Sequence, residues 1–444
     1  MMRLIFTSIL FFNMVFFLAF LRDKKDFFSP RNLLPIIYIV KLIPCMAYIS
    51  VKGVPEFIRH YTIHQAINSD AAFYKYGFLQ MFSFIAMMIV VNYLCIKNEK
   101  VESEKCQDNK HLRIKYKRWS IVFLLVGLSG AILNIQAMGG VVYFLNNLQY
   151  RTILLRDQDV LSWISSFIVY GPLLLIYSKR YMSSDKKIRI YELVFIVFIG
   201  LVHGMGGRKS ILLLLIQVVI LYHYCIKRIE IKKFFNGKNI AICAVVLIIF
   251  TLLPTLRAEG QFEYLLANPG EVLSEAIDDI SEIFVKESYV PFYISIVHLM
   301  DEGTLWYGKS FLGMLTAFIP SSLYPLKPPV DDGMYLYSMV LGRTDIMPPM
   351  TTNDLNITSY PLETFGAMYA NFGELAVIVG MIILGVIIVQ TYNVMKKKEY
   401  SFFWIITYIN VLIGFELSTL RIVQVIISIV LTGMVSICVR KIKI

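Results

Sequence analysis

The chain has 444 residues, of which 57% are hydrophobic and only 17% charged, and its mean hydropathy is +0.64. Soluble domains are about one quarter charged, so this composition excludes an ordinary soluble protein and indicates an integral membrane protein. The net charge of +12 does not indicate nucleic-acid binding, because the basic residues gather in clusters between apolar segments.

Apolar segments long enough to cross a bilayer as helices recur along the whole chain and predict an all-α polytopic membrane protein. The first segment could pass for a signal peptide, but its apolar run is too long and no small-residue cleavage site follows, so we expect an anchor. About 11 transmembrane helices are predicted, at residues 3–21, 32–51, 73–96, 119–138, 160–178, 190–204, 209–226, 239–256, 366–392, 400–418 and 422–439.

The basic clusters predict the orientation of these spans. Alternate loops hold 28 of the 43 Lys and Arg residues, and such loops are typically cytoplasmic. One large loop between spans 8 and 9 falls on the extracytoplasmic side and holds 15 acidic against 5 basic residues. The chain therefore divides into a membrane bundle (1–256), an extracytoplasmic loop (257–365) and a second membrane bundle (366–444).

The large loop is predicted to contain short amphipathic helices. Residues 269–284 have helical apolar spacing, and residues 289–300 and 310–319 are apolar enough to lie in the membrane interface. Residues 320–361, rich in Pro, Asp, Thr and Ser, are expected to be mostly loop. Its aromatic residues either stack on sugar rings or anchor the loop at the interface, namely Trp306, Tyr307, Tyr324, Tyr335 and Tyr337.

A glycine-rich turn at residues 204–210 joins the sixth and seventh spans on the outer side. A helix that starts near Ser210 would present free amides to an anion, and Gly207 with Arg208 would complete a phosphate-binding turn. The alternative is a tight hairpin with a snorkelling basic residue. A P-loop is excluded, because Arg208 precedes Lys209 where that motif needs glycine.

Two further arginines fall on the same predicted side as Arg208. Arg257 lies at the outer end of the eighth span, and Arg421 in the hairpin between the last two spans. Positive charges are disfavoured on that face, so we predict that the three bind one anion, such as a lipid-linked pyrophosphate. The alternative is separate snorkelling side chains, or ion pairs with Glu363 or Glu416. Lys41, within the second span, marks either a polar interior or a helix interface.

Several short stretches are similar to one enzyme family. The residues at 207–210, 319–322, 361–373 and 420–421 resemble motifs of the Wzy-type O-antigen and capsular oligosaccharide repeat-unit polymerases. The resemblance covers most of the chain in layout. After Arg421 the sequence departs from that pattern, with Ile422 where a small residue is expected.

The resemblance implies a membrane glycosyltransferase of polysaccharide biosynthesis. It would transfer a growing glycan from polyprenyl pyrophosphate to a new lipid-linked repeat unit, at the outer face of a bacterial cytoplasmic membrane. The implied partners are the polyprenyl-linked donor and acceptor, the lipid bilayer, and a chain-length regulator and flippase. No cofactor, metal or nucleic acid is expected.

This chemistry needs cations for the departing pyrophosphate and a general base for the acceptor hydroxyl. We assign the cations to Arg208, Arg257 and Arg421. The candidate bases are Glu363, His298, Asp331 and Asp332. Glu363 comes first and His298 second, although a histidine on an apolar helix is more often structural. The acidic pairs at 278–279 and 331–332 are expected to be solvated loop charges and not metal ligands.

Two other functions remain open. An O-antigen ligase would share the donor and the membrane face but transfer to a lipid A core. A lipid-linked oligosaccharide flippase would have two related halves and charges deep within its spans. The nearly charge-free spans and the one long outer loop favour a polymerase over a flippase.

Overall fold

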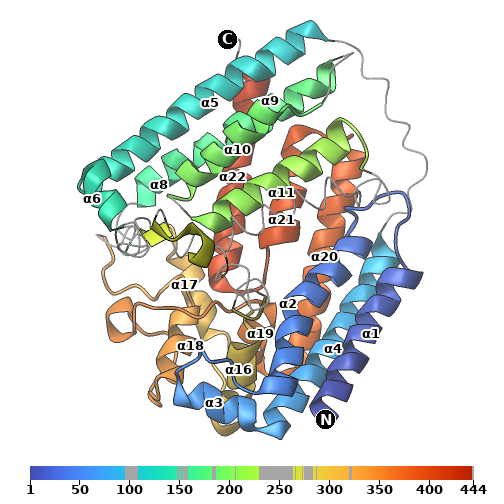
Figure 1. Ribbon diagram of the computed structural model, residues 1–444, viewed down its shortest axis with the longest axis vertical. Coiled ribbons are helices and arrows are strands. Elements are labelled where there is room, and N and C mark those ends of the chain that lie inside the picture. The colour runs from blue at the N-terminus through green and yellow to red at the C-terminus, as the bar shows by residue number, and fades with distance from the viewer. Residues whose placement is uncertain are drawn as a thin grey trace. The chain divides into compact units, whose positions relative to one another are not determined.

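The computed structural model describes residues 1–95, 109–147, 150, 154, 159–182, 187–205, 207–229, 264–265, 267–272, 274, 284–286, 288–319 and 323–442. Within these residues the regular structure is helical and contains no strand (Figure 1). Seven helical segments are long and apolar enough to cross a membrane, namely Met2–Phe20, Pro30–Lys52, Asp70–Leu94, Lys110–Ala137, Leu161–Tyr181, Glu374–Lys397 and Thr419–Lys441. The predicted class, an all-α polytopic membrane protein, is confirmed.

The shorter apolar helices Ile190–His203, Lys209–Cys225 and Phe402–Gly414 coincide with three more predicted spans. The predicted span at 239–256 lies outside the described residues, so the total of 11 stays a prediction. The described chain forms two compact units. Unit 1 comprises residues 1–97, 284–399 and 410–430, and unit 2 comprises residues 98–283, 400–409 and 431–444.

Unit 1 is built around helices that run side by side (Figure 1). Helix α1 (Met2–Phe20) packs on α2 (Pro30–Lys52), and α4 (Asp70–Leu94) packs along α20 (Glu374–Lys397). Tyr392 of α20 donates a hydrogen bond of 2.7 Å to the buried carboxylate of Asp26. This bond connects α20 to the turn between α1 and α2 and so helps to fix the positions of the helices around the site described below.

The predicted ninth span is divided into two helices. Helix α19 (Thr364–Phe372) ends at Gly373, and α20 starts at Glu374. Gly373 has φ +80°, a conformation that glycine adopts without the steric cost that a Cβ would impose. The chain turns at this point and α19 packs against α20. The residues at the start of α19 therefore lie outside the long helix α20 and can contribute to a separate site.

The described residues between 288 and 361 of unit 1 contain several short helices. Helix α16 (Val290–Glu302) starts with Pro291 in its first turn, where the missing amide hydrogen costs no helical bond. The stretch expected to be mostly loop contains α18 (Gly333–Val340) and the short helix η5 (Thr352–Asp354). Most described residues of this stretch are irregular, as predicted, and the two short helices are the exceptions; apolar residues of α18 such as Leu336 are buried in a local core.

The aromatic residues of this segment divide into two groups. Trp306 and Tyr335 are fully buried and their rings are 5.7 Å apart, so neither is available to a sugar ring or a membrane interface. Tyr307 and Tyr324 are exposed and keep both possibilities. The sequence pattern could not separate the groups, because burial depends on how α16, α18 and α19 pack.

Unit 2 contains α5 (Lys110–Ala137), α6 (Gly140–Asn146), the broken helix formed by α8 (Asp159–Ser165), η2 (Ser166–Val169), α9 (Tyr170–Ser178) and η3 (Lys179–Tyr181), and then α10 (Ile190–His203) and α11 (Arg208–Cys225). A Cβ on Gly127 would lie 2.0 Å from the backbone nitrogen of Ile168, so only glycine permits this approach of α5 to η2. Helices α21 (Phe402–Gly414) and α22 (Thr419–Lys441) contribute to both units.

Candidate functional site

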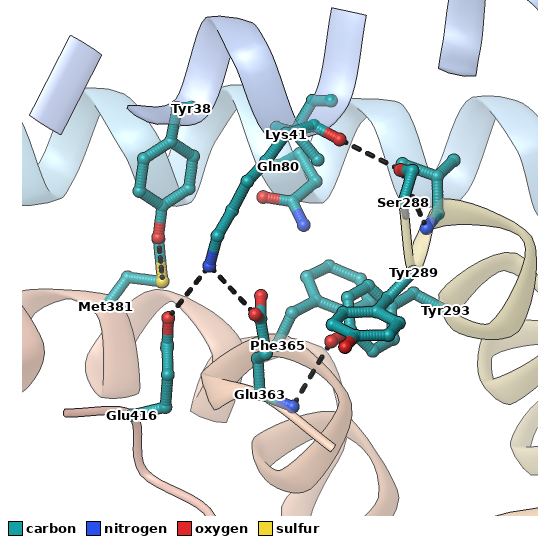
Figure 2. Close-up of a pocket in the computed structure, with 12 residues that line it drawn as sticks. Tyr38, Lys41, Gln80, Ser288, Tyr289, Tyr293, Glu363, Phe365, Met381 and Glu416 are labelled. Atoms are coloured by element: carbon teal, nitrogen blue, oxygen red, sulfur yellow. Dashed lines mark hydrogen bonds and ion pairs between the residues drawn. The ribbon is translucent and has the colours of Figure 1, made fainter. Parts of the chain in front are cut away.

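A cavity in unit 1 is lined by three charged side chains, those of Lys41, Glu363 and Glu416 (Figure 2). It has a volume of about 60 Å³ and lies between α2, α4, the start of α16, the entry to α19, α20 and the turn before α22. Its lining residues are Tyr38, Lys41, Leu42, Gln80, Ser288, Tyr289, Val290, Tyr293, Glu363, Phe365, Met381 and Glu416. A space of this volume holds a few water molecules and is too small for a sugar ring.

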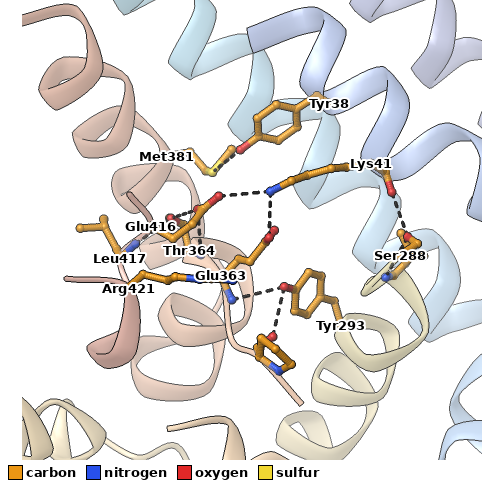
Figure 3. Close-up of polar contacts among 12 residues, drawn as sticks. Tyr38, Lys41, Ser288, Tyr293, Glu363, Thr364, Met381, Glu416, Leu417 and Arg421 are labelled. Atoms are coloured by element: carbon orange, nitrogen blue, oxygen red, sulfur yellow. Dashed lines mark hydrogen bonds and ion pairs between the residues drawn. The ribbon is translucent and has the colours of Figure 1, made fainter. Parts of the chain in front are cut away.

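Lys41 is the centre of the charge arrangement in this cavity. Its Nζ atom lies 2.8 Å from Oε1 of Glu363 and 3.5 Å from Oε1 of Glu416 (Figure 3). The side chains of the two glutamates are 16% and 15% exposed, whereas that of Lys41 is 43% exposed. Lys41 therefore lines a polar interior, the first of the two possibilities that the sequence left open. A cation within an apolar spanning helix is costly unless paired, and here it faces two carboxylates.

Glu363 is positioned by the start of α19. It occupies the N-cap position, and its carbonyl accepts the hydrogen bond from Ala367 N at 2.9 Å. Its own amide donates to the hydroxyl of Tyr293, 3.2 Å away, and this hydroxyl donates to the carbonyl of Pro361 at 3.3 Å. With the backbone held on both sides, the carboxylate points into the cavity. No hydrogen bond within the described chain occupies its second oxygen, Oε2.

Glu416 is positioned by the same turn from the opposite side. Its Oε2 atom accepts hydrogen bonds from Thr364 Oγ1 at 2.6 Å and from Thr364 N at 3.2 Å. The amide of Leu417 donates to Thr364 Oγ1 at 2.9 Å. Burial raises the pKa of Glu416, and the charge of Glu363 adds to this, while Lys41 and Thr364 oppose it. The two carboxylates therefore have different partners: Thr364 donates hydrogen bonds to Glu416, whereas Glu363 contacts Lys41.

Two uncharged side chains complete the polar lining. Gln80 donates to the hydroxyl of Tyr76 at 3.2 Å, and its buried Oε1 atom has no hydrogen-bond partner within the described chain. Figure 2 places Gln80 beside Lys41 at the cavity. Ser288 donates to the carbonyl of Lys41 at 2.9 Å and fixes the start of α16 on α2. The Gln80 oxygen can therefore accept a hydrogen bond from a ligand hydroxyl or a water molecule in the cavity.

The acidic pair at 331–332 is not a pair of solvated charges, and this part of the sequence prediction is wrong. Asp332 is 1% exposed, and its Oδ2 atom accepts a hydrogen bond of 3.0 Å from Thr419 N, the first residue of α22. Burial raises the pKa of Asp332 to about 7. Burial also raises the pKa of Asp331, which accepts a bond from Ser359 at 2.8 Å. Packing against the start of α22 buries Asp332, Asp331 is half-buried, and neither carboxyl lines the cavity.

The arginines predicted to share an anion are not brought together within one described unit. Arg421 lies in the first turn of α22 in unit 1 and donates to Gln424 Oε1 at 3.1 Å. Arg208 is the first residue of α11 in unit 2, directly after Gly207 at the N-cap. The helix therefore begins two residues before Ser210. Arg257 lies outside the described residues, so the shared anion site stays a prediction.

Of the four candidate bases, Glu363 lines the cavity, and His298, Asp331 and Asp332 do not. His298 lies on α16, whose first turn alone lines the cavity. Sequence reasoning missed the role of Glu416, which it considered only as an ion-pair partner for an arginine. A single acidic residue between two apolar segments was the available signal. No group of three or more His, Cys, Asp or Glu side chains suited to a metal ion occurs within the described residues.

The fold and the site together define an all-α polytopic membrane protein with a lysine–dicarboxylate cluster at an interior cavity. Comparisons with known family models, curated proteins and solved structures give no match to this chain.

Proposed function

We propose that this chain is a membrane glycosyltransferase that polymerises polyprenyl-pyrophosphate-linked oligosaccharide repeat units at the extracytoplasmic face of a bacterial cytoplasmic membrane. The observation that carries the proposal is the position of Glu363, the first candidate base, in a cavity where its carboxylate meets the ammonium group of Lys41. The motif resemblance around residues 207–210 and 361–373 supports the same reaction class.

Glu363 is suited to take the proton from the acceptor hydroxyl. Its Oε2 atom is not engaged within the described chain, so it can accept a hydrogen bond from the acceptor hydroxyl while Oε1 contacts Lys41 at 2.8 Å. In the proposed step the hydroxyl oxygen attacks the anomeric carbon of the donor and its proton passes to Glu363. The bond to pyrophosphate breaks, and polyprenyl pyrophosphate leaves with the electron pair.

The size of the cavity limits how the substrates lie in this proposal. A volume of about 60 Å³ accepts a hydroxyl group but not a sugar ring, so the rings bind outside and only the reacting group reaches Glu363. Gln80 Oε1 offers a second acceptor that can orient this group. Lys41 becomes a partner for negative charge on the leaving group once Glu363 is protonated.

Arg208, Arg257 and Arg421 are the proposed ligands of the pyrophosphate. A guanidinium presents two parallel donors to a phosphate group, which a lysine cannot do. Arg208 also lies at the start of the 18-residue helix α11, where the backbone amides have no partner within the helix. Arg421 lies likewise in the first turn of α22.

The glycan ladder of a deletion strain tests the proposal. A strain that carries Arg208→Ala is expected to keep the protein in its membrane but to lose long glycan chains and accumulate single repeat units. Lys209→Ala, the adjacent basic residue, is the matched control and is expected to leave the ladder normal. Restoration by Arg208→Lys would assign the role to charge alone, and a normal ladder with Arg208→Ala would contradict the anion site.

Two alternatives predict different ladders. An O-antigen ligase would use the same donor chemistry, but its deletion strain would lack even single repeat units on the lipid A core. The lysine–dicarboxylate cluster is the observation that favours a flippase, because paired charges within spans also occur in proton-coupled transporters. Loss of a flippase would retain the lipid-linked units on the cytoplasmic side, where an impermeant lectin added outside spheroplasts cannot label them.

A further inference from the structure

A second cavity lies in unit 2, where the end of η3, the start of α21 and the last turns of α22 meet the first turns of α5. Its volume is about 160 Å³, and it is lined by Tyr116, Tyr177, Tyr181, residues 401–403, Ser436, Val439 and Arg440. The rings of Tyr116 and Tyr181 stack with their centroids 5.6 Å apart and form one wall. No carboxylate lines this cavity.

Two serine hydroxyls at this cavity are donors without partners. The hydroxyl oxygens of Ser401 and Ser436 are buried and have no hydrogen-bond partner within the described chain. Arg440 also lines the cavity; its side chain is exposed and forms no ion pair with any described residue. The buried hydroxyls need acceptors and the guanidinium offers a positive charge, so a ligand with several oxygen acceptors and negative charge suits these three groups.

Backbone donors at the start of α21 add to these side chains. Ser401 precedes this 13-residue helix, and its carbonyl accepts the first helical bond from Ile405 N at 3.0 Å. The amides of Phe402 and Phe403, which line the cavity, lie in the first turn, where helical geometry provides them no carbonyl partner. The positive end of the helix dipole therefore faces the same space as Arg440.

The surroundings in unit 2 are positively charged as well. Arg180 donates to the carbonyl of Tyr400 at 2.8 Å, and Lys115 donates to the carbonyl of Arg440 at 3.2 Å. Of the neighbouring basic side chains, Lys179 is balanced, since its Nζ atom lies 2.6 Å from the carboxylate of Glu192. An anion in the cavity would therefore have basic side chains nearby.

We propose that the cavity lined by Ser401, Ser436 and Arg440 binds the phosphate group of an anionic ligand. Phosphate supplies the required oxygens, accepts paired hydrogen bonds from a guanidinium, and fits a helix N-terminus. The ligand is the headgroup of an anionic phospholipid or a free phosphate compound. The sequence predicts a cytoplasmic position for this end of the bundle, where basic residues meet anionic headgroups.

Lipid retention by the intact protein tests the site. The full chain is purified in micelles that contain phosphatidylglycerol and phosphatidylcholine, and bound lipid is counted by native mass spectrometry. The wild type is expected to retain phosphatidylglycerol selectively. Arg440→Gln is expected to weaken this binding about tenfold, the effect of losing one charge-assisted contact. The matched control is Lys441→Gln, which removes an adjacent charge of the same sign that does not line the cavity.

A parallel arm uses inorganic phosphate and the lipid-free protein. A rise in the unfolding temperature with phosphate that Arg440→Gln abolishes, without selective lipid retention, would identify a free phosphate compound as the ligand. Selective retention of phosphatidylglycerol would identify the lipid headgroup. The double variant Ser401→Ala/Ser436→Ala must weaken the same binding. The proposal is overturned if Arg440→Gln and the serine double variant match Lys441→Gln in both arms.

Discussion

The Nζ atom of Lys41 lies 2.8 Å from a carboxylate oxygen of Glu363, although the two residues are separated by 322 positions in the chain. This pair joins the middle of α2 to the entry of α19 and brings a third charge, Glu416, into the same cavity. A similar trio exists elsewhere in unit 1, because Lys75 lies 2.8 Å from Asp301 and 2.6 Å from Glu374. The second trio does not line the cavity and provides matched controls.

Glu363→Gln should abolish polymerisation without unfolding the protein. Glutamine has nearly the same shape but cannot take a proton from the acceptor, and loss of a general base costs about a hundredfold to ten-thousandfold in rate. The measurement is the glycan ladder of a deletion strain, together with the amount of protein in its membrane.

The control for Glu363→Gln is Glu374→Gln, which removes a carboxylate from the second lysine trio. Its side chain is 54% exposed, and Lys75 retains Asp301, so the ladder should stay normal. Long chains produced by the Glu363→Gln strain would refute the assignment of the base.

Lys41→Met should destabilise the protein, because it leaves two mostly buried carboxylates facing one cavity without a cation. The expected loss is about 1–3 kcal/mol, less than for a fully buried pair, since Lys41 is 43% exposed. Thermal unfolding of the purified protein in detergent measures this change.

A second substitution separates charge from packing at Lys41. Lys41→Met/Glu363→Gln removes the excess negative charge and should recover part of the lost stability. Lys75→Met removes the cation of the more exposed trio and should cost only about 0–1 kcal/mol. Equal losses of stability for Lys41→Met and Lys75→Met would show that the ion pairs at the cavity contribute no more to stability than the exposed ones.

Thr364→Val should lower stability by about 1–3 kcal/mol, because it leaves Glu416 and the part-buried amide of Leu417 without the hydroxyl that both contact. Thermal unfolding is again the measurement. Thr391→Val is the control, since the hydroxyl of Thr391 bonds only within its own helix, to the carbonyl of Ile387. If both variants unfold at the same temperature, the Thr364–Glu416 contact does not hold the turn.

Asp332→Asn should change how stability depends on pH. Burial raises the pKa of this carboxyl from 3.8 to about 7, so between these values the folded state binds the proton more tightly than the unfolded state. Wild-type stability from this group therefore falls as pH rises from about 4 to 7, by up to about 4 kcal/mol, and is constant above that. The asparagine variant lacks this fall and should gain on the wild type between pH 5 and pH 8.

Unfolding temperatures at pH 5 and pH 8 measure the Asp332 effect. Asp345→Asn is the control of opposite sign, because a hydrogen bond from Arg343 lowers the pKa of the exposed Asp345 carboxyl. The stability contributed by the Asp345 carboxylate is lost only as pH falls below about 4. Asp345→Asn should therefore not change how stability depends on pH between pH 5 and 8. A pH dependence that is identical in the wild type and Asp332→Asn would contradict the buried, protonated carboxyl.

The sequence by itself determined the all-α membrane class, since runs of apolar residues reach the length of a bilayer crossing and their backbones must satisfy hydrogen bonds internally. It also indicated Glu363 as the first candidate base and showed that Lys41 is a charged residue within an apolar segment. Those inferences depend on local composition, which the order of residues records directly.

Only the tertiary structure decided which charges meet. Lys41, Glu363 and Glu416 come from three distant segments, and their pairing depends on how α2, α19 and the turn before α22 pack. The same holds for Asp332, a loop residue by its sequence, which becomes a buried cap of α22 through contact with Thr419. Desolvation and partner choice are properties of the packed chain, and they decide which acidic residues lie at the cavity and which are buried beside a helix end.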